Sequence, residues 1–171
     1  MTFLEGDTFN FHGDEKETYD LYFSNHVLHR VPDKQVAFNN MYKCLKPGGR
    51  IAIHWVEDLA DLGKYTFKTL NPENYDRLMN EMYQLECKDA IEGYCKRAGF
   101  EITHTERTHV RWLWETTAEF LEWAQASNHG LFTLDLVNEE RMRNYHPPRD
   151  EKGRPLWKQS ELKLIAVKVL I

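Results

Sequence analysis

The sequence lacks the features that mark secreted and membrane proteins. It has only three cysteines among 171 residues. This odd number, without metal-ligand spacing, favours a reduced intracellular protein. No apolar run approaches the ~18 residues that a membrane span needs. The first residues have neither the basic start nor the apolar core of a signal peptide. We therefore expect a soluble, cytoplasmic protein without membrane contact.

A basic surplus is also absent. The formal net charge is −5, and acids interrupt the Lys and Arg residues along the chain. A surface for nucleic acid is therefore not expected. An apolar content of 42% with 13% aromatic residues excludes wholesale disorder. The length suits one domain with a sizeable core, so we treat residues 1–171 as a single domain.

The first half of the chain carries the pattern of a βαβ unit. Leu21–Ser24 is a short apolar run that ends in polar residues, as a buried strand does. A helical pattern follows over Pro32–Leu45, with the helix expected to end near Lys46. Pro47-Gly48-Gly49 then breaks the chain before a second apolar run, Ile51–Val56. Such a unit predicts two parallel strands joined by a right-handed crossover.

Polar side chains stand at the carboxyl ends of both predicted strands. Ser24, Asn25 and His26 follow the first strand, and His54 lies near the end of the second. Ligands of open α/β sheets bind outside such ends, so a site is predicted there. His26 is a candidate general base, and the alternative for each histidine is a local hydrogen-bonding role.

The second half of the chain predicts further helices and strands. Thr116 and Glu119 have the spacing of a capping box at the start of a helix. Charge, proline and glycine in 138–160 indicate a mobile loop or lid. The remaining segments are expected as a helical insertion or cap at 57–86, a helix at Cys87–Gly99, a strand from Phe100 and a closing strand at Leu162–Ile171.

Four short motifs together resemble the second half of a class I S-adenosylmethionine-dependent methyltransferase, of the small-molecule type 11/12 group. They are Phe3–Asp7, Tyr19–Leu21, Ser24–His29 and Leu45–Arg50. The resemblance implies an α/β, Rossmann-like sheet with helices on both faces, which here lacks its first two strands. Its last strand is antiparallel and lies between two parallel strands.

The resemblance also implies S-adenosyl-L-methionine as cofactor. The acid at Asp7 would accept a hydrogen bond from the adenine amino group, and Thr8 would line the adenine pocket. The residues at the fourth strand's end would lie near the cofactor's methionine part and the methyl group. The cofactor-binding residues carried over are Gly6, Asp7, Thr8, Ser24, Asn25 and His26.

Two elements of the family pattern are missing from this sequence. No glycine-rich loop precedes a strand, and no acid that would hold the ribose hydroxyls is found. The chain is therefore either the carboxy-terminal part of a longer protein or a shortened product. We expect weak or no cofactor binding by this chain alone. The Leu21 strand would form an exposed apolar edge, which favours self-association.

The substrate is expected to be a small molecule. The aromatic second half resembles methyltransferases of lipophilic small acids, such as juvenile hormone acid methyltransferase, which suggests a lipophilic carboxylic acid. Arg30 replaces an aromatic residue of that group and could pair with a carboxylate in bidentate fashion. Trp112 and Trp114 could wall the pocket or fill the core. The candidate substrate residues are His29, Arg30, His54, Trp112 and Trp114.

No metal site is expected. His26 and His29 are three residues apart and His104 and His109 five apart, but no carboxylate or cysteine completes a tetrahedral ligand set with either pair. Two other functions stay open beside methyl transfer. One is a non-catalytic, methyltransferase-like interaction module. The other is a different nucleotide-binding α/β enzyme, such as half of a dehydrogenase, although the dinucleotide fingerprint is absent from the sequence.

Overall fold

The computed structural model divides the chain into two compact units. The first comprises residues 1–57, 86–108 and 161–171, and the second comprises 58–85 and 109–160. The described residues are 16–58, 61–82, 85–127 and 132–169. The motif Phe3–Asp7 and the adjacent Thr8, which include the predicted adenine-binding residues, lie outside them.

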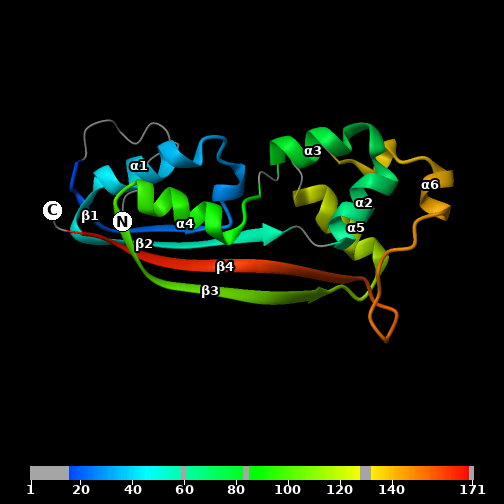
Figure 1. Ribbon diagram of the computed structural model, residues 1–171. Helices are drawn as coiled ribbons and strands as arrows, with labels where there is room; N and C mark the ends of the chain where they lie inside the picture. Colours follow the sequence, from blue (N-terminus) through cyan, green and yellow to red (C-terminus); the bar gives the residue numbers. More distant parts are fainter. Residues whose placement is uncertain (1–15, 59–60, 83–84, 128–131, 170–171) are drawn as a thin grey trace. The chain divides into compact units, whose positions relative to one another are not determined.

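The strands form one sheet with the order β1-β2-β4-β3. The four strands are β1 (Tyr19–Asn25), β2 (Leu45–Asp58), β3 (Phe100–Leu113) and β4 (Leu156–Lys168). β1 and β2 are parallel, as the βαβ pattern predicts. β4 lies between β2 and β3 and runs in the opposite direction (Figure 1). The predicted antiparallel last strand between two parallel strands is confirmed.

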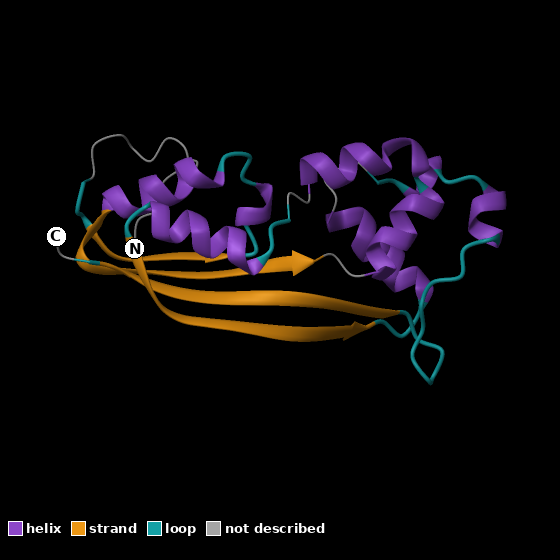
Figure 2. Ribbon diagram, in the orientation of Figure 1, coloured by secondary structure: helices purple, strands orange, loops and turns teal. Residues whose placement is uncertain are grey.

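Two helices cover one face of the sheet in the first unit (Figure 2). They are α1 (Lys34–Cys44) and α4 (Lys88–Arg97), and a 3-10 turn, η1 (Leu28–Arg30), precedes α1. The side chain of Asp33 caps α1 by accepting a hydrogen bond from the N–H of Val36 at 3.0 Å. The apolar stripes of both helices pack on alternate residues of the strands, which makes the core of this unit.

The Pro-Gly-Gly segment differs from its predicted form. α1 ends at Cys44 rather than near Lys46, and β2 already begins at Leu45. Tyr19 pairs with Leu45 but Leu21 pairs with Arg50, so the extra residues of β2 form an irregular bulge. Gly48 has a φ of 79° within it, a conformation that favours glycine. The predicted turn is therefore built into the start of the strand.

The opposite face of this sheet carries exposed apolar side chains. Leu21 is 57% exposed, Phe23 67% and Ile165 38%. Among the described residues of the first unit, both α-helices lie on the other face. The expected helices on both faces are thus seen on one face in this part of the chain.

The second unit contains short helices around an aromatic core. Its α-helices are α2 (Asp61–Leu70), α3 (Tyr75–Met82), α5 (Thr117–Ser127) and α6 (Glu139–Arg143), with 3-10 turns η2 (Pro72–Asn74) and η3 (Leu134–Leu136). α2 and α3 occupy the predicted helical segment 57–86, whose role as an insertion or cap stays a prediction. The segment 138–160 contains α6 and the first residues of β4, and its mobility also stays a prediction.

The predicted capping box is confirmed at the start of α5. The N–H of Glu119 donates to the Thr116 hydroxyl at 3.2 Å, and the Glu119 carboxylate accepts from the N–H of Thr116 at 3.3 Å. Both residues thereby satisfy donors that the first turn of a helix leaves free.

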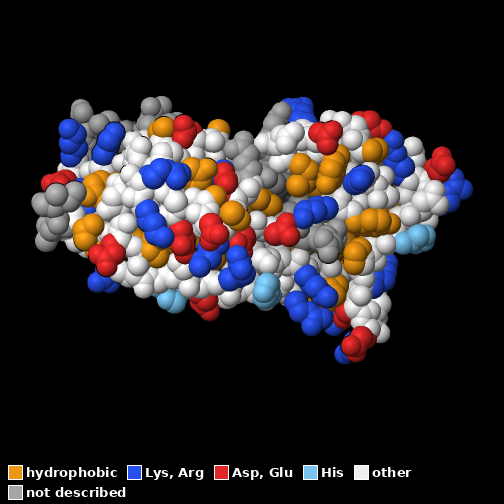
Figure 3. Space-filling model, in the orientation of Figure 1, with side chains coloured by type: hydrophobic (Ala, Val, Ile, Leu, Met, Phe, Trp, Pro, Cys, Tyr) orange, Lys and Arg blue, Asp and Glu red, His pale blue; other side chains and the backbone are white. Residues whose placement is uncertain are grey.

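The charged surface is mixed. On the face that Figure 3 draws, Lys and Arg side chains are interspersed with Asp and Glu. Within the described segments, no helix has the length and apolar character to cross a membrane.

The two faces of the first unit's sheet predict different responses to truncation of a leucine. Leu164 is fully buried in the core, so Leu164→Ala should lower the free energy of unfolding by about 2–5 kcal/mol. The control Leu21→Ala, on the exposed edge strand, should change it by less than about 0.5 kcal/mol. Urea unfolding measures both. Equal losses would contradict this assignment of buried and open faces.

Candidate functional site

The carboxyl end of β1 lies beside β2 and brings together two of the predicted site residues. Asn25 and His54 are register partners in the parallel ladder. Ile53 and Trp55 join the helix-covered core, so His54 points to the opposite face of the sheet. There its Nδ1 lies 2.9 Å from the Asn25 Oδ1. Ser24, the residue before Asn25, is buried. The predicted polar edge is present.

His26 stands at this edge in an unusual backbone conformation. Its φ is 54°, in the left-handed region that residues other than glycine seldom occupy. Its N–H donates to the carbonyl of His54 at 2.7 Å, and the two imidazole rings meet edge to face with centroids 4.5 Å apart. Residues with strained backbone conformations are common at functional sites, so the conformation of His26 supports its place among the candidate site residues.

Glu161 completes the cluster, and sequence analysis missed it. It lies on β4, the strand beside β2, and its side chain is only 5% exposed. Its Oε2 lies 2.8 Å from the His54 Nε2, and its Oε1 lies 3.7 Å from the His26 Nε2. The residue directly precedes the predicted closing strand. An acid beside a buried apolar run was the only signal of it in the sequence.

The environment shifts the protonation of His26. Burial lowers the pKa of its imidazole from the ordinary value, and neighbouring His54 lowers it further, while the negative charge of Glu161 opposes the shift. The lowered pKa favours a neutral ring that carries a lone pair at neutral pH.

His29 and Arg30 lie in the turn η1. His29 is buried, and the Arg30 Nε donates to its Nε2 at 3.4 Å. Burial, together with smaller contributions from nearby Arg30, His26 and Lys34, lowers the pKa of His29 to about 4. His29 therefore has a structural position, and its contact with a substrate stays a prediction, as does that of Arg30.

Trp112 and Trp114 belong to the second unit, in an aromatic cluster. The ring of Trp114 lies 5.0 Å from Phe120 and 5.3 Å from Trp123, measured between centroids. Trp112 stacks on Trp157 at 6.3 Å. Both side chains thus contribute to the packing of this unit. Their role in a substrate pocket stays a prediction.

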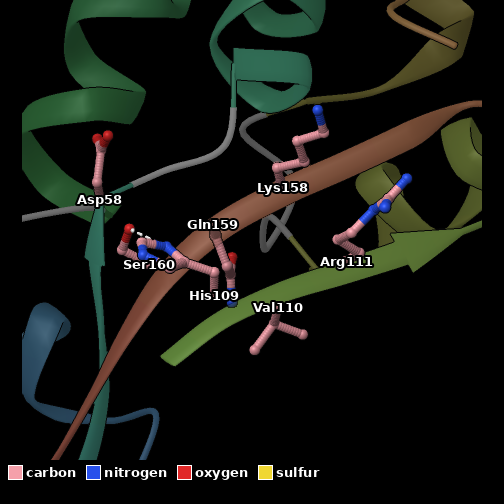
Figure 4. A pocket seen from close by; sticks show the side chains of 7 residues that line it. All are labelled: Asp58, His109, Val110, Arg111, Lys158, Gln159 and Ser160. Carbon is pink, nitrogen blue, oxygen red and sulfur yellow. Dashed lines mark hydrogen bonds between the residues drawn. The ribbon is translucent and has the colours of Figure 1, made fainter. Parts of the chain in front are cut away.

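The second unit has a cavity of about 380 Å³ on β3 and β4. Figure 4 shows the side chains of His109 and Ser160 turned toward each other, and the His109 Nδ1 lies 3.2 Å from the Ser160 Oγ. Val110 points to the other side. The cavity mixes the charges of Arg111 and Lys158 with that of Asp58, so it selects no ligand of one charge.

A model of the methyltransferase domain matches residues 4–105, which is more than half of the chain. The chain belongs to the methyltransferase domain family. The described part of this methyltransferase domain has the sheet order and antiparallel strand that the resemblance implies, which agrees with the α/β, Rossmann-like fold of class I enzymes. By this membership it is an S-adenosylmethionine-dependent methyltransferase, and S-adenosylmethionine is its cofactor. Resemblance to juvenile hormone acid methyltransferase in particular is not confirmed, and the interaction module is not favoured.

Solved structures agree on the fold at low sequence identity. A candidate methyltransferase of Bacillus halodurans has a TM-score of 0.66 and 14% identity, over 97% of this chain and 71% of its own. The YcgJ protein of Bacillus subtilis has a TM-score of 0.64 and 10% identity, over 97% and 70%. A SAM-dependent methyltransferase of Methanosarcina mazei has a TM-score of 0.54 and 12% identity, over 97% and 66%. No curated protein matches the sequence.

The described residues fit part of a S-adenosylmethionine site. The cofactor's methionine end carries an ammonium and a carboxylate group, and the edge offers hydroxyl, amide and imidazole groups from Ser24, Asn25 and His26. Ser24 and Asn25 are the last residues of β1 and His26 follows them, so all three lie at the carboxyl end of a strand, where such folds bind ligands.

The buried position of His29 predicts an acid-sensitive methyltransferase domain. The unfolded chain takes up the imidazole proton near pH 6.5 and the folded chain near 4, so stability falls as the pH drops between these values. Between pH 7 and pH 5 the free energy of unfolding should fall by about 2 kcal/mol more in the wild type than in His29→Gln. Urea unfolding at both pH values measures this difference. An identical pH dependence in the variant would refute it.

Proposed function

We propose that this domain transfers a methyl group from S-adenosylmethionine to a small molecule where β1 ends beside His54 of β2. The observation that carries the proposal is the polar cluster at this end of β1. There Asn25 and His54 are in register, and His26 is held in a left-handed conformation beside them. The membership in the methyltransferase domain family supports it.

Methyl transfer mainly requires that the acceptor atom be aligned with the methyl–sulfur bond of the cofactor. S-adenosylmethionine supplies a methyl group on a sulfonium sulfur, which an oxygen, nitrogen or sulfur lone pair of the acceptor displaces in line. In our proposal Gly6, Asp7 and Thr8 bind the adenine side. Ser24, Asn25 and His26 bind the methionine end and the region of the methyl group. Holding both partners in line removes most of the entropic barrier.

His26 is the proposed catalytic residue. Its half-buried imidazole contacts the acceptor, and its lowered pKa keeps the ring neutral, so Nε2 can accept the acceptor's proton or hold the acceptor atom. His54 has one nitrogen toward Asn25 and the other toward Glu161, so its ring is fixed in position.

The acceptor is proposed as a small molecule. Two structural neighbours support this class: a candidate sarcosine dimethylglycine methyltransferase of Galdieria sulphuraria and a candidate histamine N-methyltransferase of Thermotoga maritima. A lipophilic carboxylic acid is the narrower proposal, with Arg30 as the carboxylate partner. The proposed substrate residues are His29, Arg30, His54, Trp112 and Trp114.

The proposal is tested by calorimetric titration of the purified chain with S-adenosylhomocysteine. Asp7→Ala should weaken binding by about 1–3 kcal/mol, because a buried hydrogen-bonding group of the ligand loses its partner. The matched control is Asp20→Ala, since the carboxylate of Asp20 forms an exposed ion pair with Lys46 at 2.9 Å. Pairs of this kind contribute little, so binding should stay unchanged.

Methyl transfer itself is measured with methyl-labelled S-adenosylmethionine and a panel of small carboxylic acids and amines. Label in an acceptor supports the proposal. Unchanged binding in Asp7→Ala would remove Asp7 from the site, and no binding by a cooperatively folded wild-type chain would refute cofactor binding by this chain alone.

A second copy of the chain is the proposed protein partner. β1 is the edge strand of the sheet formed by the described residues, and Phe23 on it is 67% exposed. Phe23→Lys should therefore shift the chain toward monomer in sedimentation velocity at micromolar concentration. Val36→Lys, which changes an exposed valine on α1, should not. A monomeric wild type would refute self-association.

A further inference from the structure

His26, His54 and Glu161 place three metal-binding atoms close together. One nitrogen or oxygen from each residue lies within 4.8 Å of the other two. The His54 Nε2 lies 2.8 Å from the Glu161 Oε2, and the His26 Nε2 lies 3.7 Å from the Glu161 Oε1. Tetrahedral ligands at zinc bond lengths lie about 3.3 Å apart, so small movements would fit one ion.

The hydrogen bond of Asn25 sets the orientation of His54. The Asn25 Oδ1 only accepts, so the Nδ1 of His54 at 2.9 Å carries the hydrogen. In a neutral ring the Nε2 then presents a lone pair toward the Glu161 Oε2 at 2.8 Å. Two lone pairs repel at this distance unless a cation lies between them. That cation is either a proton or a metal ion.

A hydrogen bond such as that between His54 and Asn25 is typical of histidines that bind a metal ion. Such a histidine usually donates its other ring N–H to an oxygen, which fixes the tautomer and the ring plane. The carboxylate is also prepared for a cation, because the Glu161 side chain is 5% exposed. Buried carboxylates are stable when paired with a cation or coordinated to a metal.

We propose that His26, His54 and Glu161 bind one divalent transition-metal ion of the zinc class. Two imidazole nitrogens and one carboxylate oxygen suit Zn²⁺ or Co²⁺, whereas Mg²⁺ and Ca²⁺ prefer oxygen ligands alone. Three protein ligands leave a fourth position open, as in catalytic zinc sites. This replaces the expectation of no metal, which considered His26 only with its sequence neighbour His29.

The open position would hold the oxygen or nitrogen of the methyl acceptor. This consequence rests on the proposed function, whereas metal binding itself does not. A metal-bound hydroxyl would lose its proton to solvent more easily than a free one, and its oxygen would then take the methyl group as the methyl–sulfur bond breaks and S-adenosylhomocysteine leaves. His26 would then act on the acceptor through the ion.

The test uses the full chain with Co²⁺ as a spectroscopic probe and Zn²⁺ in calorimetry. Cys87 is exposed, so Cys87→Ser serves as the background that removes a competing thiolate. One ion per chain is expected, with visible Co²⁺ bands of nitrogen and oxygen ligation. His54→Gln and Glu161→Gln should each weaken binding by more than about 100-fold, since even changes outside the ligand set cost about 10–100-fold. Asn25→Leu, which changes a residue outside the ligand set, should weaken metal binding by about 10–100-fold.

Two further variants keep the test independent of folding. His26→Asn should also lose the ion but keep the backbone, because Asn is tolerated in the left-handed region. His104→Gln is the matched control. It changes an exposed histidine that has its own acidic neighbour, Glu106, at 4.0 Å, and should bind the ion as the wild type does. Circular dichroism melts confirm that each variant is folded.

The proposal is overturned if the folded chain binds no ion, or if His54→Gln and Glu161→Gln bind it as tightly as His104→Gln. An N–H on the His54 Nε2 that persists in nitrogen-15 NMR at saturating Zn²⁺ would also overturn it, since the shared cation would be a proton. Binding of S-adenosylhomocysteine is measured in a separate titration, so the metal site and the proposed function are tested independently. Cofactor binding without metal binding would refute only the metal site, and metal binding without cofactor binding would refute only cofactor binding by this chain alone.

Discussion

The parallel pairing of β1 with β2 is the constraint on which the polar edge depends. The ladder sets Asn25 opposite His54, and it continues past the end of β1 through the hydrogen bond from the His26 N–H to the His54 carbonyl. This last bond accompanies the left-handed backbone of His26. A shift of one residue in this register would turn the Asn25 side chain to the opposite face of the sheet and dissolve the cluster.

The central position of β4 supplies the remaining charged group. β4 lies next to β2, so Glu161 reaches the edge of the βαβ unit from a segment far along the chain. Its buried carboxylate couples both histidines to one negative charge. The two histidines are thereby connected through one carboxylate, and replacing Glu161 would remove a partner from both.

The polar cluster lies in the first unit, and the tryptophan cluster lies in the second. In the first unit, the core of α1 and α4 leaves polar groups and exposed apolar residues on the other face of the sheet. In the second unit, the tryptophans pack mainly on one another. The buried histidine of η1 and the histidine at the end of β1 are only three residues apart. His29 is buried in the turn, whereas His26 is partly exposed beside Glu161.

Local sequence determined much of this fold. The βαβ pattern, the helix at Cys87–Gly99 and the capping box of Thr116 and Glu119 follow from periodicity and turn residues. These features depend on residues close together in the chain, whereas the antiparallel last strand was expected from the family resemblance alone. The bulge at Pro47-Gly48-Gly49 did not follow, because pairing with β1 drew the segment into the sheet.

Only the tertiary structure decided which polar residues meet. Sequence spacing pairs His26 with His29, but burial takes His29 into the turn, and the ladder brings His54 to His26 instead. Glu161 is 107 positions from His54, and no local pattern links them. The physical reason is that strand order is set by packing and pairing of the whole sheet. Local preference fixes the strands but leaves their neighbours undetermined.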